Sequence, residues 1–124
     1  MLLDTAVLIF SIESPGRLSK RAFAVLANPE NIRELSSISL AEIAIKKTLG
    51  KLNISAEDVR QAIQDMDIHV LPFTADHAFR LFELPAHHGD PFDRQIIAQA
   101  FAEDVPVVTS DEKFSLYKGL KIVW

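Results

Sequence analysis

The sequence predicts an α/β fold of three layers, in which helices cover both faces of a central parallel sheet. Short apolar segments typical of strands alternate along the chain with segments whose apolar residues recur at helical spacing. One short segment, Val105–Thr109, is almost continuously apolar, as strands of a parallel sheet are when both of their faces are buried. Because strand–helix–strand connections are right-handed, this alternation places helices on both sides of the sheet.

The amino-terminal part of the chain contains two of the expected strands. Met1–Thr5 is a short buried strand, and Leu35–Ile38 is the second. The helix after the second strand begins with a capping box, Ser39–Glu42, and runs to Leu49 before a glycine. The other segments expected here are a helical turn at Ala6–Phe10, a loop at Ser11–Gly16 and a helix at Leu18–Leu26.

The clearest helix start in the chain lies at Asp90. Gly89 ends the preceding segment, Asp90 is a favourable N-cap, Pro91 fits the first helical position, and apolar residues then recur at helical spacing through Phe101. The other elements expected in this part are a helix at Ala56–Met66 capped by Ser55, a strand at Ile68–Leu71, a short helix capped by Thr74, the strand at Val105–Thr109, a helical turn at Asp111–Phe114 and a last strand at Lys121–Trp124.

Length and composition predict one domain over residues 1–124. A chain of 124 residues with 48% hydrophobic and 24% charged residues has the composition of a globular protein and can bury about two-thirds of its unfolded surface. The absence of cysteine excludes disulfides and thiolate metal sites, and it agrees with a reducing cytoplasm. The apolar run Ala6–Phe10 is too short to cross a bilayer, and Asp4 replaces the basic region of a signal peptide. We therefore expect a soluble, unprocessed cytoplasmic protein with no membrane partner.

Four acidic residues stand at junctions between strands and helices. Asp4 interrupts an apolar run, where a buried carboxylate costs several kcal/mol unless cations or donors compensate it. The other three have local explanations. Glu42 completes a capping box, Asp93 is a first-turn acid facing the positive end of the helix dipole, and Asp111 begins a helical turn.

In a parallel sheet, however, the carboxyl ends of the strands and the starts of the following helices share one edge. The four acids are then predicted to crowd one crevice, where they repel each other unless they are neutralised. Carboxylates without cysteine or a spaced histidine motif suit Mg²⁺ or Mn²⁺. The implied chemistry is phosphoryl transfer to water, for which such ions polarise the phosphate and supply the attacking hydroxide.

The net charge of −4 at first argues against a nucleic-acid partner. If the four junction acids bind metal, the rest of the chain is neutral, and bound ions reverse the local sign. The acidity therefore does not decide the question.

Several polar residues near these junctions are candidates for supporting roles. Thr5, Thr109 and Ser110 could donate hydrogen bonds to carboxylates or phosphate, or could satisfy backbone groups instead. Arg94 and Lys46 are candidate phosphate contacts, with simple ion pairing as the alternative; Lys46 stands four residues after Glu42. Three of the four histidines, His77, His87 and His88, have no metal-ligand spacing and are expected to lie on the surface or in loops.

The chain also resembles a known family, and the resemblance spans nearly its whole length. The matching segments are Leu3–Thr5, Ser39–Lys46 with Gly50–Leu52, His88–Ala100, and Thr109–Asp111 with Phe114, which look like the VapC-type toxins among PIN domains. This resemblance implies a metal-dependent ribonuclease acting on RNA, with Asp4, Glu42, Asp93 and Asp111 holding the metal and Asp90 beside them. It also implies an antitoxin partner that occupies the groove, and a homodimer. Ala6 departs from the pattern, since relatives usually carry a polar residue after the Asp-Thr pair.

Three other interpretations remain open. An RNA-processing PIN nuclease without an antitoxin would share the same acids. A phosphatase with an aspartyl-phosphate intermediate requires an acid two residues after Asp4, where the chain has Ala6. A receiver-like signalling module requires a lysine after its last central strand, where the chain has Asp111.

Overall fold

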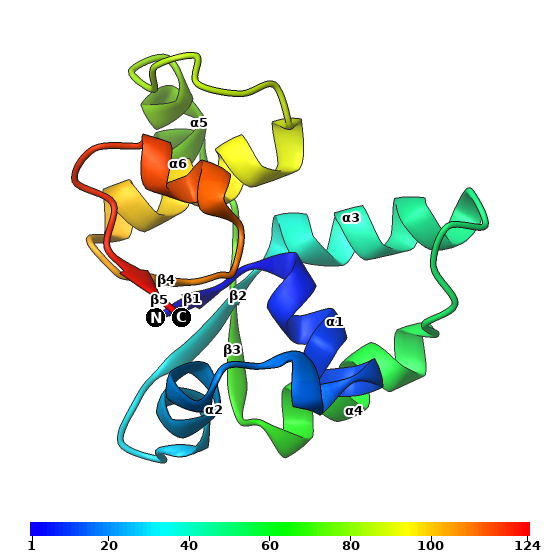
Figure 1. The fold of residues 1–124 in the computed structure, drawn as a ribbon. Coiled ribbons are helices and arrows are strands. Elements are labelled where there is room, and N and C mark those ends of the chain that lie inside the picture. Colours follow the sequence, from blue (N-terminus) through cyan, green and yellow to red (C-terminus); the bar gives the residue numbers. More distant parts are fainter.

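The computed structural model describes residues 1–124 and confirms the α/β class. Five parallel strands form one sheet in the order β3-β2-β1-β4-β5 (Figure 1). The strands are β1 (Leu2–Leu3), β2 (Arg33–Ser36), β3 (Ile68–Leu71), β4 (Val107–Val108) and β5 (Ile122–Val123). The helices are α1 (Thr5–Glu13), α2 (Lys20–Ala27), α3 (Ser37–Thr48), α4 (Ala56–Asp65), α5 (Ala75–Leu81) and α6 (Pro91–Glu103), with 3-10 turns η1 (Pro15–Arg17) and η2 (Glu112–Leu116).

The two residues of the central strand face opposite sides of the sheet, as the strand period of two requires. Leu3 packs in a core cluster with residues of α1, α2, α3 and α4, whereas Leu2 packs in a second cluster with α6 and η2. Figure 1 shows the same division, with α1, α2 and α4 on one side of the sheet and α5 and α6 on the other. The expected three layers are therefore present.

Strand β1 positions the functional edge because it lies between β2 and β4. Leu3 pairs with Leu35 on one side and with Val108 on the other, so the three strands end at nearly the same level. The residues that follow these ends are Asp4, the start of α3, and Thr109. Asp4 therefore lies between the other two strand ends.

Some of the expected boundaries are wrong. Strand β2 covers Arg33–Ser36 and not Leu35–Ile38, so Ser37 and Ile38 belong to α3. The N-cap of α3 is Ser36, whose side chain accepts a hydrogen bond from the Ile38 backbone, so the predicted capping box at Ser39–Glu42 does not form. Helix α1 continues to Glu13, through the first half of the segment Ser11–Gly16 that was expected as a loop. The expected caps Ser55, Thr74 and Asp90 do form at the starts of α4, α5 and α6, and in the structure the first two belong to capping boxes. No helix of the structure has the length and apolar character needed to cross a bilayer.

Candidate active site

Asp4 lies at the carboxyl end of β1 and is only 5% exposed. Although it occupies the N-cap position of α1, its side chain makes no capping hydrogen bond and instead accepts one from the Thr109 hydroxyl at 2.8 Å. Burial raises the pKa of Asp4 to about 6, the Thr109 hydrogen bond opposes this rise, and the charges of Glu42 and Asp111 add to it. The side chain of Asp4 therefore does not serve as a helix cap.

Asp93 has the most strongly raised pKa among the acids at this edge of the sheet. It lies in the first turn of α6, where the helix dipole favours a negative charge. Its pKa is nevertheless raised to about 7, by burial first and then by the charges of Asp4, Asp90, Glu42 and Asp111. Repulsion of this kind means that acids from separate elements face one another, as the strand-end argument predicts.

Glu42 is buried within α3 rather than at its start. Its Oε2 atom accepts a hydrogen bond from Lys46 Nζ at 2.6 Å, while its other carboxylate oxygen, Oε1, is buried without a hydrogen-bond partner. An unpaired buried acceptor costs about 1–3 kcal/mol. Because the capping box is absent, helix formation gives no reason for a buried glutamate at this position.

Asp111 reaches the site through a short connection after β4. Its side chain accepts a hydrogen bond from the Lys113 backbone and so caps η2. Its own backbone N–H donates to the Thr109 hydroxyl at 3.0 Å, and this same hydroxyl donates to Asp4. Thr109 thus holds the two acids relative to each other, and it does both things that the sequence left open, since it donates to a carboxylate and accepts from a backbone N–H.

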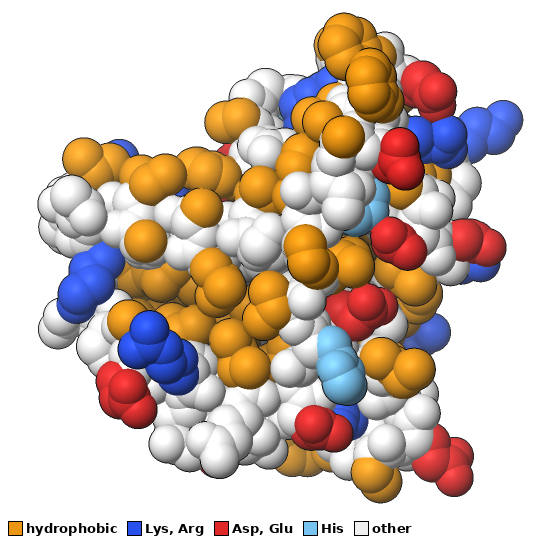
Figure 2. Space-filling view, turned by 180° about the vertical axis from the view of Figure 1, so that it is seen from behind, with side chains coloured by type: hydrophobic (Ala, Val, Ile, Leu, Met, Phe, Trp, Pro, Cys, Tyr) orange, Lys and Arg blue, Asp and Glu red, His pale blue; other side chains and the backbone are white.

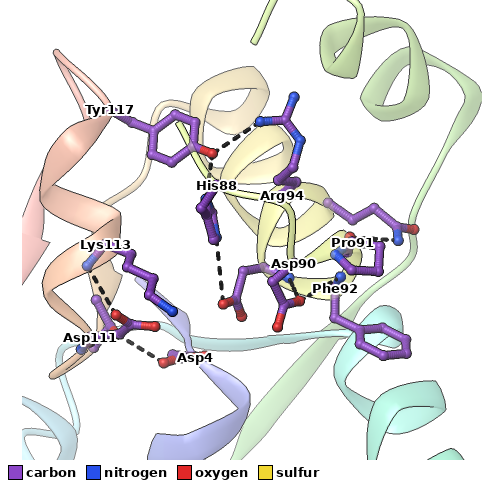
Figure 3. A network of polar contacts seen from close by, with 12 residues as sticks. Asp4, His88, Asp90, Pro91, Phe92, Arg94, Asp111, Lys113 and Tyr117 are labelled. Carbon is purple, nitrogen blue, oxygen red and sulfur yellow. Dashed lines mark hydrogen bonds and ion pairs between the residues drawn. The ribbon is translucent and has the colours of Figure 1, made fainter. Parts of the chain in front are cut away.

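Asp90 is exposed and caps α6 by accepting hydrogen bonds from the backbones of Phe92 and Asp93. Its carboxylate contributes to the negative potential at Asp93. Figure 3 shows the side chains of Asp90, Asp111 and Asp4 around a shared space, with the Lys113 side chain extending toward it. Lys113 was not predicted, and nothing in its sequence context marks it.

The residues predicted to support the acids differ in the contacts that they make. Lys46 forms the ion pair with Glu42 that helical spacing allowed. Thr5 donates to the buried Ser39 hydroxyl at 2.8 Å, so it fastens α1 to α3. Arg94 neither forms an ion pair nor has a guanidinium available to bind phosphate. Its guanidinium donates hydrogen bonds to the backbone oxygens of Leu84 and Pro85 and to the Tyr117 hydroxyl. Ser110 is exposed at the edge.

The expectation that the histidines lie on the surface or in loops is wrong for His77, which is buried in α5. His77 is 3% exposed, and its two ring nitrogens face the Thr74 backbone and the Glu103 carboxylate. His88 does lie in a loop, but its side chain is only 9% exposed and contacts Tyr117 and Asp93. His87 is exposed as expected. Sequence spacing could not reveal the contacts with Glu103 and Tyr117, which lie 26 residues from His77 and 29 residues from His88.

The donor set of the edge consists of carboxylate oxygens, which suits hard divalent ions. The Oε1 atom of Glu42 is buried and has no hydrogen-bond partner, so it is an oxygen of the kind that could bind such an ion. No three histidine or acidic side chains in the structure already lie at the spacing of a single ion's ligand shell.

Comparison with known proteins identifies the family. The family model described as PIN domain matches residues 1–120. This chain is a PIN domain. Solved structures with the same fold include VapBC2 from Rickettsia felis bound to a DNA fragment from its promoter, with 21% identity and a TM-score of 0.74 over 98% of this chain and 95% of that chain. Another is DNA-bound VapBC from Salmonella typhimurium, with 21% identity and a TM-score of 0.73 over 98% and 94%. FitAcB from Neisseria gonorrhoeae has 19% identity and a TM-score of 0.65 over the same shares. No protein with a curated description matches the chain.

Proposed function

We propose that this PIN domain is a divalent-metal-dependent endoribonuclease and the toxin of a VapBC-type toxin–antitoxin pair. The observation that supports this most strongly is the burial of acids from separate elements beside one another. It raises the pKa values of Asp93 and Asp4, through burial first and then through the charges of the neighbouring acids. A protein that lacked a use for this charge would gain stability by replacing it. Membership of the PIN family and the fold shared with VapBC structures favour the same function.

The residues that would hold Mg²⁺ or Mn²⁺ are Asp4, Glu42, Asp93 and Asp111, with Asp90 as an outer contributor. Such an ion polarises the scissile phosphate and lowers the pKa of water, so that hydroxide forms at neutral pH. The chain's own contribution is to keep the carboxylates in place. Thr109 orients Asp4, and the Lys46 pair holds one oxygen of Glu42 while leaving Oε1 unpaired.

The raised pKa values also favour cation binding over a bare acidic cluster. The part of each rise that comes from repulsion among the carboxylates reflects free energy that a divalent cation can recover. An acid that has no lysine or arginine partner can bind a cation without first breaking an ion pair. Only Glu42 of the four has a lysine partner within ion-pair distance.

We further propose an antitoxin as protein partner and a homodimer as the assembly. An apolar groove of about 430 Å³ runs between α3 and α4, lined by residues that include Leu40, Ile43, Val59 and Ile63. Figure 2 shows hydrophobic side chains gathered in a hollow of the molecular surface. Such a groove suits the apolar face of a partner segment. The solved complexes named above support an antitoxin as this segment's source.

The decisive experiment measures cleavage of single-stranded RNA with Mn²⁺ and with EDTA. The wild-type protein is expected to cleave only with metal, and Asp4→Asn to lose at least a hundredfold in rate. Glu57→Gln is the matched control, because Glu57 is an exposed acid in α4 that pairs only with Arg60. Equal rates for wild type and Asp4→Asn would refute the proposal. Labelling of the protein by a small phosphoryl donor without RNA cleavage would instead support the phosphatase or receiver interpretation.

A further inference from the structure

Three side chains form a hydrogen-bonded chain that ends beside Asp93. Arg94 in α6 donates from its guanidinium to the Tyr117 hydroxyl at 3.0 Å, and this hydroxyl lies 2.7 Å from His88 Nδ1. His88 Nε2 lies 3.7 Å from Asp93 Oδ2. Figure 3 shows the arrangement, with His88 between Tyr117 and the acidic space.

The direction of these hydrogen bonds follows from the chemistry of the groups. A guanidinium can only donate, so the Tyr117 oxygen accepts from Arg94. Tyr117 is 2% exposed, and its hydroxyl has no polar partner other than Arg94 and His88. If His88 Nδ1 donated, the buried tyrosine proton would have no acceptor, which is costly. The tyrosine therefore donates to Nδ1, and the imidazole proton stands on Nε2.

This assignment gives the Nε2 atom a specific role. The Nε2 atom of His88 is buried and has no hydrogen-bond partner in the structure. A buried N–H without an acceptor costs about 1–3 kcal/mol. The nearest charged group is the Asp93 carboxylate at 3.7 Å, just beyond hydrogen-bond length, so a small rotation of that side chain completes the bond.

We propose that His88 is a positioning residue for Asp93, held in its Nε2–H tautomer by the Arg94–Tyr117 pair. The inference rests on the proposed function, since Asp93 is a metal ligand only within it. By donating to one carboxylate oxygen, His88 directs the other toward the cation. Groups that orient metal ligands in this way typically change metal affinity or activity by 10- to 100-fold.

The neighbouring histidine provides a control within the same loop. The rings of His87 and His88 both contact Tyr117 edge-on, with centroid separations of 5.0 and 5.5 Å. His87 has no polar contact with Asp93 and is exposed. If ring packing alone mattered, removing either histidine would have similar consequences.

The test compares Mn²⁺ affinity by calorimetry for the wild type, His88→Ala, His88→Gln, Tyr117→Phe and His87→Ala. We expect His88→Ala to weaken binding 10- to 100-fold and His87→Ala to change it less than twofold. His88→Gln retains an amide donor near the Nε2 position and should recover most of the affinity. In Tyr117→Phe the ring remains and the hydroxyl is lost, so affinity should fall by up to about tenfold.

Nitrogen-15 spectra of the metal-free protein give an independent readout. The wild type should show a protonated Nε2 and an unprotonated Nδ1 at His88, and Tyr117→Phe should show both tautomers. Protonation at Nδ1 in the wild type, or Mn²⁺ affinity of His88→Ala within twofold of the wild type, would overturn the inference. Mn²⁺ binding that depends on His88 without any RNA cleavage would contradict the proposed function and leave the positioning role supported.

Discussion

Replacing Asp93 with asparagine separates the two explanations for this acid. As a simple first-turn charge, Asp93 stabilises α6 through the helix dipole, and its loss would cost about 0.3–1 kcal/mol. As a largely buried charge that also faces other acids, it destabilises the metal-free fold. The rise of its pKa from 3.8 to about 7 corresponds to roughly 4 kcal/mol at 1.36 kcal/mol per unit. The side chain is 15% exposed, and screening by solvent reduces the expected net gain for Asp93→Asn to about 1–2 kcal/mol.

The sign of the pH dependence follows from the direction of this pKa shift. The folded state holds the Asp93 proton more tightly than the unfolded state, so the stabilisation linked to that proton is complete below the unfolded pKa near 3.8. It is lost as the pH rises through the folded value near 7. The advantage of Asp93→Asn over wild type should therefore be small at pH 4 and reach its full size above pH 7.

The assay is urea unfolding in EDTA at pH 4 and pH 8, combined with Mn²⁺-dependent RNA cleavage by the same preparations. We expect the variant to be the more stable protein at pH 8 and to cleave at least a hundredfold more slowly than wild type. A variant that is less stable than wild type at pH 8 and cleaves normally would refute the reasoning, because both results belong to a structural charge.

Three further outcomes are expected. Glu42→Gln should leave the free energy of unfolding within about 1 kcal/mol of the wild-type value, because Ser36 and not Glu42 caps α3. RNA cleavage should be lost, and normal cleavage would show that Glu42 is not part of the site. Thr109→Val should destabilise the fold by about 1–3 kcal/mol in urea unfolding, because the buried Asp4 carboxylate loses its donor and the Asp111 N–H its acceptor. Mn²⁺ at a hundredfold excess over its Kd should raise stability by about 2.7 kcal/mol, and an unchanged melting temperature would argue against the metal site.

The parts of the fold that sequence predicted well are those determined by local signals. Helix α6 begins where Asp90 and Pro91 place it, because the cap and the first turn involve only neighbouring residues. The start of α3 was misplaced for the opposite reason. The segment contains three serines that could cap, and the choice of Ser36 depends on where β2 ends, which is set by its pairing with Leu71 in β3.

The position of the four acids at one edge of the sheet was predictable because strand ends in a parallel sheet share an edge, whatever the side-chain details. Their immediate partners were not. Tyr117 and His88 meet through the packing of η2 against α6, and no periodicity in the sequence reports that approach. The contact between His77 and Glu103 was equally unpredictable, because Glu103 lies at the far end of another helix, α6.

The bond between Thr109 and Asp4 joins residues separated by 105 positions in the chain. During synthesis, amino-terminal segments emerge and begin to fold first. A nascent chain that ends before β4 has Asp4 and Glu42 but neither Thr109 nor Asp111, and its central strand lacks a neighbour on one side. Contacts of such long range also form late in folding. For the nuclease proposed above, a chain that has not yet reached β4 therefore lacks Asp111 and the donor that orients Asp4, so activity is expected only when nearly the whole protein has been made.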